Sequence, residues 1–534
     1  MSILEGTPKT AVSPAPSAAT SRGGSLAGGS PPPGLSRPAK SMRVVLLALL
    51  IATFLSALDA SIVSTAMPTI VGKLGGFSKY TWVTTAYIVT QTISTMLLGK
   101  LGDLFGRRGV FLWGIGIFVV GSALCGLAQN MNQLIVFRGI QGIGGGGIFG
   151  LSFAIIGDLV PPATRGKYFG FFTSTFALAN IAGPLVGGVI VDHTSWRWIF
   201  YVNLPLGILA LAMAASALHL PPGRRAPIDF AGAGLLIAAI TAFMVALEQG
   251  DQQGWSSAFT VVMFVVALVA TVGFIVREKR APEPILPMHL FKNDILRTAY
   301  LMAFLLGSTV MAVGLFFALF FQDVGFNSPT RAGLMTFPMM FGATIASIIV
   351  GRRISSKGRY RIFPIVGASM AMVACILASR ITVNSSYPFL ALSLALLGLG
   401  LGTSMPPLSI AVQNAGDQSD IGVVTASWNF FRTLGSAVGL AVNGAMLTMI
   451  IGSQLRHKLG PAGGRLSNVV RDPRSIKAMA DSTRRAVQES ITTGISRIFL
   501  LGAALTLLSV LVSFTMREIP LRQQSGVELR AAME

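Results

Sequence analysis

The stretch "GKLGDLFGRR" (residues 99–108) decides the fold, because a related stretch recurs later in the chain. Four of its residues have counterparts at identical spacing in "GRRISSKGR" (residues 351–359): Gly99, Asp103, Gly106 and Arg107 match Gly351, Ser355, Gly358 and Arg359. Each stretch follows the second apolar segment of a group of six. Parallel repeats of this kind predict two pseudo-twofold-related halves, with a substrate cavity between them near the bilayer midplane.

Composition places the repeat in a membrane. The 534 residues are 52% hydrophobic and 11% charged, which is too little polar surface to cover a soluble globule. The net charge of +21 would suit nucleic acid, but the basic residues form short clusters between apolar runs and make no recognisable nucleic-acid module. We therefore expect an all-α polytopic membrane protein whose main partner is the lipid bilayer and which binds no nucleic acid.

Fourteen apolar segments of about 20 residues follow one another in groups of six, two and six. They lie at about 44–66, 80–98, 109–128, 134–157, 168–190, 197–218, 229–247, 258–276, 297–321, 332–350, 361–379, 388–412, 422–451 and 495–516. This pattern predicts a six-helix half (42–220), a two-helix linker (221–292) and a second six-helix half (293–522). Residues 1–41, rich in Pro, Ser, Gly and Ala, are expected to be a disordered cytoplasmic tail, and 523–534 a second cytoplasmic tail.

Basic residues orient the spans, because cytoplasmic loops carry an excess of Lys and Arg. With the N-terminus inside, the cytoplasmic loops contain Lys100, Arg107, Arg108, Arg165, Lys167, Arg224, Arg225, Arg277, Lys279, Arg280, Arg352, Arg353, Lys357, Arg359 and Arg361. Through the twelfth span the outer loops hold only Lys73, Lys79, Arg197, Arg331 and Arg380. A long basic segment at 452–494 is expected to be an external loop, since long segments translocate with less regard to charge.

The motifs together resemble one family. "GKLGDLFGRR" is similar to the loop signature of the major facilitator superfamily, with Gly102 and Leu104 in place of its usual Ala and Arg. The chain also carries "LDASIVSTAMP", "RGIQGIGGGG", "GPLVGG", "WRWIFYVNLPLG", "FQDVGFNSPTRAGL", "VQNAGDQSDIGVVTASWNFFRTLG" and "EIPLR". In this order the motifs resemble the fourteen-helix drug:proton antiporters of that superfamily. The resemblance implies the major facilitator fold, with 14 transmembrane helices arranged 6 + 2 + 6, and no enzyme activity.

The loop signature supplies a candidate gate made of Gly99, Asp103, Gly106, Arg107 and Arg108. Asp103 can accept hydrogen bonds from exposed helix-terminal N–H groups while Arg107 pairs with it. We call Asp103 and Arg107 the latch and expect it to hold one of two alternating states, as the family's gating positions imply. A well-capped tight turn is the alternative. The second half lacks this acid, because Ser355 stands at the position equivalent to Asp103.

The fifth span contains the pattern that the resemblance assigns to exporters: Gly183, Pro184, Gly187 and Gly188. Ala179, Gly183 and Gly187 recur every four residues and give a smooth stripe for close helix packing. Pro184 removes a backbone donor and is expected, with Gly188, to bend the helix. Ordinary close packing of helices is the alternative explanation for these small residues.

Asp59 is the only ionisable residue between Arg43 and Lys73. An Asp at a helix centre in lipid costs about 2.5 to 3.5 kcal/mol, so such residues usually face a cavity and serve a function. Arg138 in the fourth span lies in the same outer half of the bilayer and can pair with it. The family places its coupling acid at this motif, so we expect Asp59 to face the cavity and carry the coupled proton. A static ion pair is the alternative.

Polar and aromatic residues elsewhere in the spans are candidates for the substrate cavity, although helix packing explains most of them: Trp82, Gln91, Gln141, Phe176, Asn180, Gln322, Gln413, Trp428 and Arg432. Arg432 has no intramembrane acid in its own half and is expected to cap carbonyl groups around "FFRTLG".

Cys125 and Cys375 lie in apolar runs and are expected to be buried free thiols. No phosphate-binding loop or metal-ligand cluster is found, so we expect no cofactor beyond protons as the coupling ion and no metal.

These features favour a proton-coupled exporter of drugs or small amphiphiles in the cell (plasma or inner) membrane. The alternative is a dedicated exporter of an endogenous lipid, siderophore or metabolite. A transporter-like receptor without turnover is less favoured, because Asp59 and the latch are both retained. We expect a functional monomer, and an accessory envelope protein stays an open question.

Topology gives the first test. A reporter fused after Arg225 or Lys357 should read cytoplasmic, and one fused near Pro461 should read external. Paired reporters that are active on only one side of the membrane make this measurement. A cytoplasmic reading at Pro461 would contradict the fourteen-span arrangement.

Overall fold

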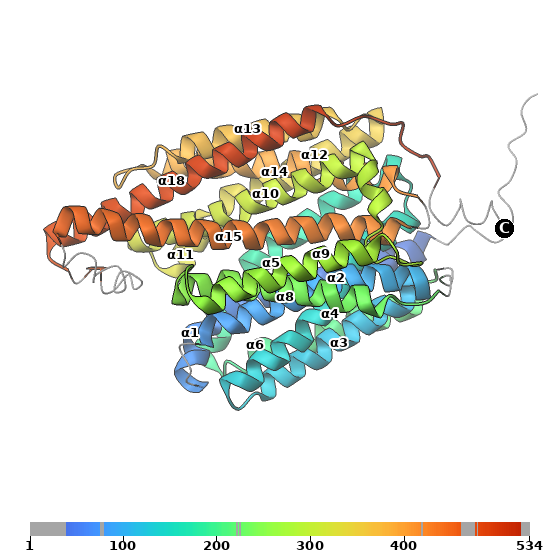
Figure 1. Ribbon diagram of the computed structural model, residues 1–534, viewed down its shortest axis with the longest axis horizontal. Coiled ribbons are helices and arrows are strands. Elements are labelled where there is room, and N and C mark those ends of the chain that lie inside the picture. Colours follow the sequence, from blue (N-terminus) through green and yellow to red (C-terminus); the bar gives the residue numbers. More distant parts are fainter. Residues whose placement is uncertain are drawn as a thin grey trace, which may run out of the picture.

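The computed structural model of the protein describes residues 39–74, 79–220, 223, 226–417, 420–460, 476–477 and 479–524. All regular elements in these ranges are helices, and the long ones run roughly along one common axis (Figure 1). The first expected tail lies outside the described residues except at its end, where the first helix already begins at Ala39. The second tail lies outside them from residue 525 onward.

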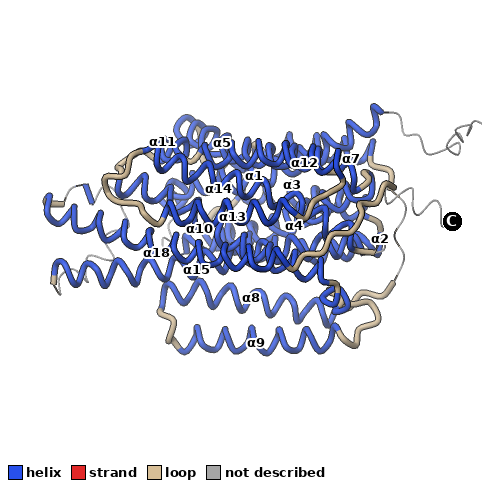
Figure 2. The backbone as a smooth tube through the Cα atoms, turned by 90° about the horizontal axis from the view of Figure 1, so that it is seen from above, coloured by secondary structure: helices blue, strands red, loops and turns tan. Residues whose placement is uncertain are grey.

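All fourteen predicted segments fall on helical structure. The first half consists of α1 (Ala39–Leu74), α2 (Tyr80–Phe105), α3 (Arg107–Leu127), α4 (Met131–Leu159), α5 (Gly166–His193), α6 (Trp198–Tyr201) and α7 (Asn203–Ala217). The second half consists of α10 (Asp294–Leu319), α11 (Pro329–Met335), α12 (Phe337–Lys357), α13 (Ile362–Ala378), α14 (Tyr387–Ala415), α15 (Ile421–Leu459) and α18 (Asp481–Phe514). Between them, α8 (Phe230–Gln253) and α9 (Ala258–Glu278) form a hairpin at the edge of the bundle, next to α2 and α15 (Figure 2).

Twelve of the described helices are long and apolar enough to cross a membrane. Two further helices of the bundle, α2 and α13, fall outside that set; α13 has only 17 residues, and both pack along full-length neighbours, α4 and α14. The count of fourteen spans therefore stays a prediction.

The segment at 452–494, which was expected to be a long external loop, is helical at both of its ends, because α15 continues to Leu459 and α18 already begins at Asp481. The two helices continue to pack beyond their apolar segments. Leu455 and Val487 are both fully buried, and Lys458 Nζ lies 2.6 Å from Glu489 Oε2. Apolar contacts and an ion pair thus extend helices that hydropathy alone ends too early.

The two copies of the sequence repeat have equivalent backbone roles. Gly106 and Gly358 both adopt positive φ, 95° and 69°, where a side chain would be strained. A Cβ on Gly99 would lie 2.5 Å from Ala426 Cβ of α15, and a Cβ on Gly351 would collide with the backbone of Gly166 at the start of α5. The repeat therefore brings the halves together at two related contacts, α2 with α15 and α12 with α5.

Close approach also shapes the first half, where "GGGG" (residues 144–147) runs along α4. A Cβ on Gly144 would meet Gly114 O at 2.6 Å and the Phe118 backbone on α3, so only glycine lets the two helices approach this closely. Cys125 and Cys375 are buried and free, as predicted.

Gly144→Ala tests this packing. The added methyl group must push α3 and α4 apart, and we expect a loss of about 1 to 3 kcal/mol, seen as a lower apparent Tm of the purified protein. Gly139→Ala on the same helix is the matched control, because its Cβ would meet only Thr90 Cγ2, at 3.8 Å. Equal Tm values for the two variants would contradict the close-packing role of Gly144.

Candidate functional site

Asp59 lies on α1 with no exposed surface and accepts three side-chain hydrogen bonds. Arg138 Nη1 of α4 donates to Oδ2 at 2.6 Å, and Gln141 Nε2 of the same helix donates to Oδ1 at 2.8 Å. Asn203 Nδ2, at the start of α7, donates to Oδ1 at 2.8 Å. We call Asp59, Arg138, Gln141 and Asn203 the acid network. Its ionised groups are paired as charges inside a membrane must be.

A second layer encloses the acid network. The Tyr87 ring of α2 lies 4.1 Å from the Arg138 guanidinium carbon, and the Tyr87 hydroxyl is 3.1 Å from Ser56 Oγ. Gln141 Oε1 accepts a hydrogen bond from Arg138 Nη1 at 2.6 Å, so the two side chains that bind Asp59 from α4 also bind each other. The expectation that Asp59 is accessible to a central cavity is wrong in this conformation, because these partners occupy the space around it.

The latch lies where α2 ends and α3 begins, at the end of the bundle where α18 also ends, on the right of Figure 1. Arg107 donates to Asp103 Oδ1 through Nη2 at 2.7 Å and Nε at 3.1 Å, and both side chains are only 3% exposed. Arg107 also forms an ion pair with Asp158 at the end of α4. Asp103 therefore does more than cap a turn, since a buried three-membered charge cluster joins α2, α3 and α4.

Asp103 also connects the two halves. Its Oδ2 accepts a 2.9 Å hydrogen bond from the Val423 backbone N–H, in the first turn of α15. That carboxylate is stabilised by the exposed N–H groups and the positive end of the helix dipole. A Cβ on Gly422 would collide with the carboxylate of Asp103, so glycine at this position makes room for the contact.

Arg165 makes a second contact between the halves at the same side. It is 1% exposed and donates to Gln413 Oε1 of α14 at 3.0 Å, while Gln413 Nε2 donates to Phe153 O at 3.1 Å. Burial lowers the pKa of Arg165 to about 9, opposed by the charge of Asp158 and assisted by nearby Arg522. Among the described residues, every hydrogen bond between the two halves lies at this side.

The sequence did not reveal the roles of two of these side chains, Asp158 and Arg165, and it led to the wrong location for two others, Gln413 and Gln141. Arg165 was counted as a loop charge and Asp158 was not considered, although an acid and a base flanking the short "LVPPAT" connection after a span were a usable signal. Gln413 was expected in the substrate cavity and instead forms the contact between halves; Gln141 was expected there and instead belongs to the acid network.

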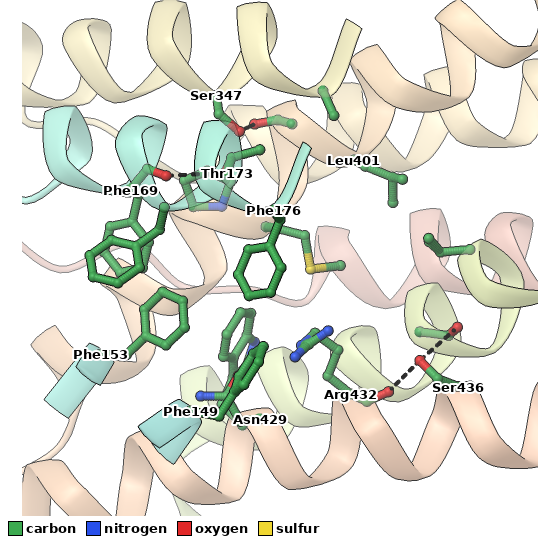
Figure 3. Close-up of a pocket in the computed structure, with 18 residues that line it drawn as sticks. Phe149, Phe153, Phe169, Thr173, Phe176, Ser347, Leu401, Asn429, Arg432 and Ser436 are labelled. Carbon is green, nitrogen blue, oxygen red and sulfur yellow. Dashed lines mark hydrogen bonds between the residues drawn. The ribbon is translucent and has the colours of Figure 1, made fainter. Parts of the chain in front are cut away.

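A cavity of about 260 Å³ lies between the halves, next to these contacts (Figure 3). One wall is aromatic: α4 supplies Phe149 and Phe153, and α5 supplies Phe169, Phe172 and Phe176. The opposite wall comes from α10, α12, α14 and α15 and includes Trp428, Asn429 and Arg432. Of the described residues that line it, Arg432 alone is charged.

Arg432 points into this cavity from α15 (Figure 3). Its guanidinium carbon lies 5.8 Å from the Phe149 ring centre, across the interface between the halves. Within the described part of the chain its guanidinium has no carboxylate within 4.0 Å and donates no hydrogen bond. The expectation that Arg432 caps carbonyl groups is therefore wrong. Phe176, Trp428 and Arg432 line this cavity, and their contact with a substrate stays a prediction.

The remaining candidates lie elsewhere. Gln91 Nε2 is 3.5 Å from the Tyr87 hydroxyl, Trp82 is half-buried near the start of α2, and Gln322 lies in a short π-helix after α10. None of them lines the central cavity. Asn180 lines a separate small cavity of about 60 Å³, together with Pro184, between α5 and the α11–α12 region.

Two glycines of the exporter pattern on α5, Gly183 and Gly187, face α1 of the same half. A Cβ on Gly183 would collide with Ser61, and one on Gly187 would lie 3.4 Å from Ile62 O, while Gly188 has open space around it. Pro184 lies within an uninterrupted helix. Arg108 of the gating motif donates to Ala215 O at 2.8 Å, which ties α3 to the end of α7.

Known proteins agree with this architecture. The chain is 35% identical over 478 residues to Multidrug resistance protein 3 of Bacillus subtilis, covering 86% of this chain and 92% of that protein. It is 40% identical over 430 residues to Multidrug transporter protein MdtP of the same organism, covering 79% and 78%. It is also 32% identical over 514 residues to the Acurin A biosynthesis cluster MFS-type transporter of Aspergillus aculeatus, covering 92% of each.

Among solved structures, the human organic anion transporter MFSD10 matches with a TM-score of 0.60 at 18% identity, covering 88% of this chain and 100% of that one. The proton:xylose symporter XylE matches with a TM-score of 0.58 at 13% identity, covering 93% and 100%. These two likenesses concern the fold alone. The family model of the Major Facilitator Superfamily matches residues 49–440, and the chain belongs to this superfamily of multi-pass membrane transporters, which are not enzymes.

Proposed function

We propose that the protein is a proton-coupled exporter of small amphiphiles that works by alternating access in the cell membrane. The sealed acid network carries this proposal: Asp59 has no exposed surface and holds Arg138 at 2.6 Å. The described helices hold few such buried acids within the first half, and this one, which lies on α1, is bound by residues of α4 and α7. Relatives named as multidrug transporters support the export of drug-like molecules.

Protonation of Asp59 would change the balance between two arrangements. A neutral carboxyl group no longer forms an ion pair with Arg138, so the electrostatic attraction between the two groups is lost. A ligand, here the proton, shifts a conformational equilibrium only by its differential affinity for the two states. The proton is therefore expected to bind Asp59 in an outward-facing state and leave it in an inward-facing state, while substrate moves the other way.

The latch supplies the second element of the cycle. Asp103, which Arg107 binds, holds the halves together through Val423, and Arg165 does so through Gln413, at the side that we assign to the cytoplasm. Opening toward the cytoplasm requires the Asp103 to Val423 hydrogen bond to break. This conformation is thus one that is closed to the cytoplasm, and the charge on Asp103 favours it.

We further propose that α2 and α13 cross the membrane, which gives fourteen spans. At 1.5 Å per residue the 17 residues of α13 extend roughly 26 Å, close to the hydrocarbon thickness of about 30 Å. The mean hydropathy of α2 is lowered by its threonines and by Lys100 and Asp103, and these two charges lie in its last turns. Both termini would then be cytoplasmic.

A dedicated exporter of one endogenous compound is the second candidate. The observation that favours it is the similarity, over 92% of each chain, to a transporter whose name places it in a biosynthesis cluster. A substrate screen in a pump-deficient host separates the two candidates: a multidrug exporter protects against several unrelated amphiphiles, and a dedicated exporter against none of them.

Asp103→Asn tests the latch. The amide keeps the size of the side chain but removes the charge that binds Arg107 and the N-terminus of α15, so the closed state loses stability relative to the other state. We expect normal abundance and a loss of most transport in a whole-cell efflux assay. Asp294→Asn is the control, since Asp294 forms a surface ion pair with Arg297 at 3.0 Å. Normal transport by Asp103→Asn would leave Asp103 with a capping role only.

Asp59→Asn tests proton coupling. We expect uphill efflux driven by a pH gradient in inverted vesicles to fall roughly tenfold or more, because the amide cannot exchange a proton between the two states. Downhill exchange of the same fluorescent substrate across proteoliposomes should persist. Asp229→Asn is the matched control, since Asp229 is a buried acid paired with Arg277 at 2.9 Å in the linker hairpin.

A static Asp59–Arg138 pair predicts a different outcome. Asp59→Asn would then lower abundance, and adding Arg138→Gln would restore function because no unpaired charge would be left. Proton-driven accumulation by a well-expressed Asp59→Asn protein would exclude Asp59 as the obligatory coupling site.

A further inference from the structure

The central cavity has one unbalanced charge. Its wall contains five phenylalanines, a tryptophan and small or apolar residues, and in the part of the chain that the structure describes Arg432 is the one charged residue that lines it. Asp59 cannot compensate, because Arg138 already pairs with it at 2.6 Å and the acid network is sealed from the cavity. The cavity therefore presents one positive charge in a water-poor, aromatic surrounding.

Other polar atoms of the wall are also unused. Trp428 is 4% exposed, and its indole Nε1–H has no acceptor among the described residues. The side-chain oxygen of Asn429 likewise has no donor there. Buried polar atoms are usually paired, so unpaired ones in a cavity wall indicate positions where a ligand can supply the partner.

We infer that this cavity binds an aromatic or otherwise apolar amphiphile that carries a single negative charge, with its acidic group on Arg432. An arginine binds a carboxylate or a similar oxyanion through two parallel N–H···O bonds, which are strongest where water is excluded. The apolar body of the ligand lies against Phe149 and Phe176, whose ring centres are 5.1 Å apart. This inference rests on the proposed export function and names the charge class of its substrate.

A cationic amphiphile would be disfavoured in the same place. It would gain the same apolar contacts, but its charge would face the unpaired guanidinium without a carboxylate in the cavity wall to offset the repulsion. Specificity therefore depends on a repulsive as well as an attractive element.

Binding to the purified protein in nanodiscs tests the inference with three matched probes: 4-(1-naphthyl)butanoate, its methyl ester and 4-(1-naphthyl)butylamine. Isothermal titration should give a carboxylate affinity roughly tenfold or more above that of the amine, since one charge-assisted interaction separates them. Arg432→Gln should lower carboxylate affinity roughly tenfold, to the level of the ester, and leave ester affinity unchanged. Arg432→Lys should keep part of the preference, and Arg497→Gln, on the exposed face of α18, should keep all of it.

Two results would overturn the inference: a wild-type protein that binds the amine as tightly as the carboxylate, or an Arg432→Gln protein with unchanged carboxylate affinity. If Arg432→Gln does not fold, as loss of ester binding would show, the wild-type probe series and Arg432→Lys decide the matter. Equilibrium binding needs no proton gradient. Anion preference without pH-driven transport would therefore contradict the export proposal alone, and pH-driven transport without anion preference would contradict this inference alone.

Discussion

The cost of an unpaired charge away from water is the constraint on which this structure depends. Two groups of charges inside the bundle satisfy it by pairing. Asp59 is enclosed by Arg138, Gln141 and Asn203, and Asp103 is held by Arg107 and the N-terminus of α15. Each pairing joins different helices, so each fixes a relative position of helices as well as neutralising charge. The charges thus determine which arrangement of the bundle is stable.

Small residues allow the helices to approach closely enough for these charged groups to pair. Glycine at position 422 leaves room for the Asp103 carboxylate at α15, and Gly99 lets α2 approach Ala426 on the same helix. Without hydrophobic driving force between helices in lipid, such close contacts depend on van der Waals packing and hydrogen bonds. The contact between Gly166 and Gly351 is formed by backbone alone, and Arg165, the residue before Gly166, adds a buried charged hydrogen bond to Gln413. Both sides of the interface therefore combine a close glycine contact with a buried charged group.

Much of the fold could be predicted from the sequence because apolar periodicity and repeated motifs are local signals. The positive φ of Gly106 and Gly358 matches their equivalent places in the repeat. The pairing of Asp59 with Arg138 followed from their similar depth in the bilayer. Depth along a helix follows from residue number, but the rotation of the whole helix about its axis relative to its neighbours does not.

That difference explains the errors. Gln141 and Gln413 lie at depths compatible with the cavity, yet both face neighbouring helices and serve other contacts. Asp158 and Arg165 became part of the interface only once three helices met at one side of the bundle. The length of α15 and α18 was underestimated because their packing beyond the apolar segments is a tertiary effect.

The acid network and the central cavity are separate places that share one helix. Arg138 and Gln141 bind Asp59 from α4, and Phe149 and Phe153 of the same helix form part of the aromatic wall. The eight positions from Gln141 to Phe149 correspond to roughly 12 Å along the helix axis. A proton at Asp59 and a ligand at Arg432 consequently do not compete for the same atoms. Any coupling between them has to be carried by a shift or rotation of α4, which is held at one end by Asp59 and at the other, through Asp158, by Arg107.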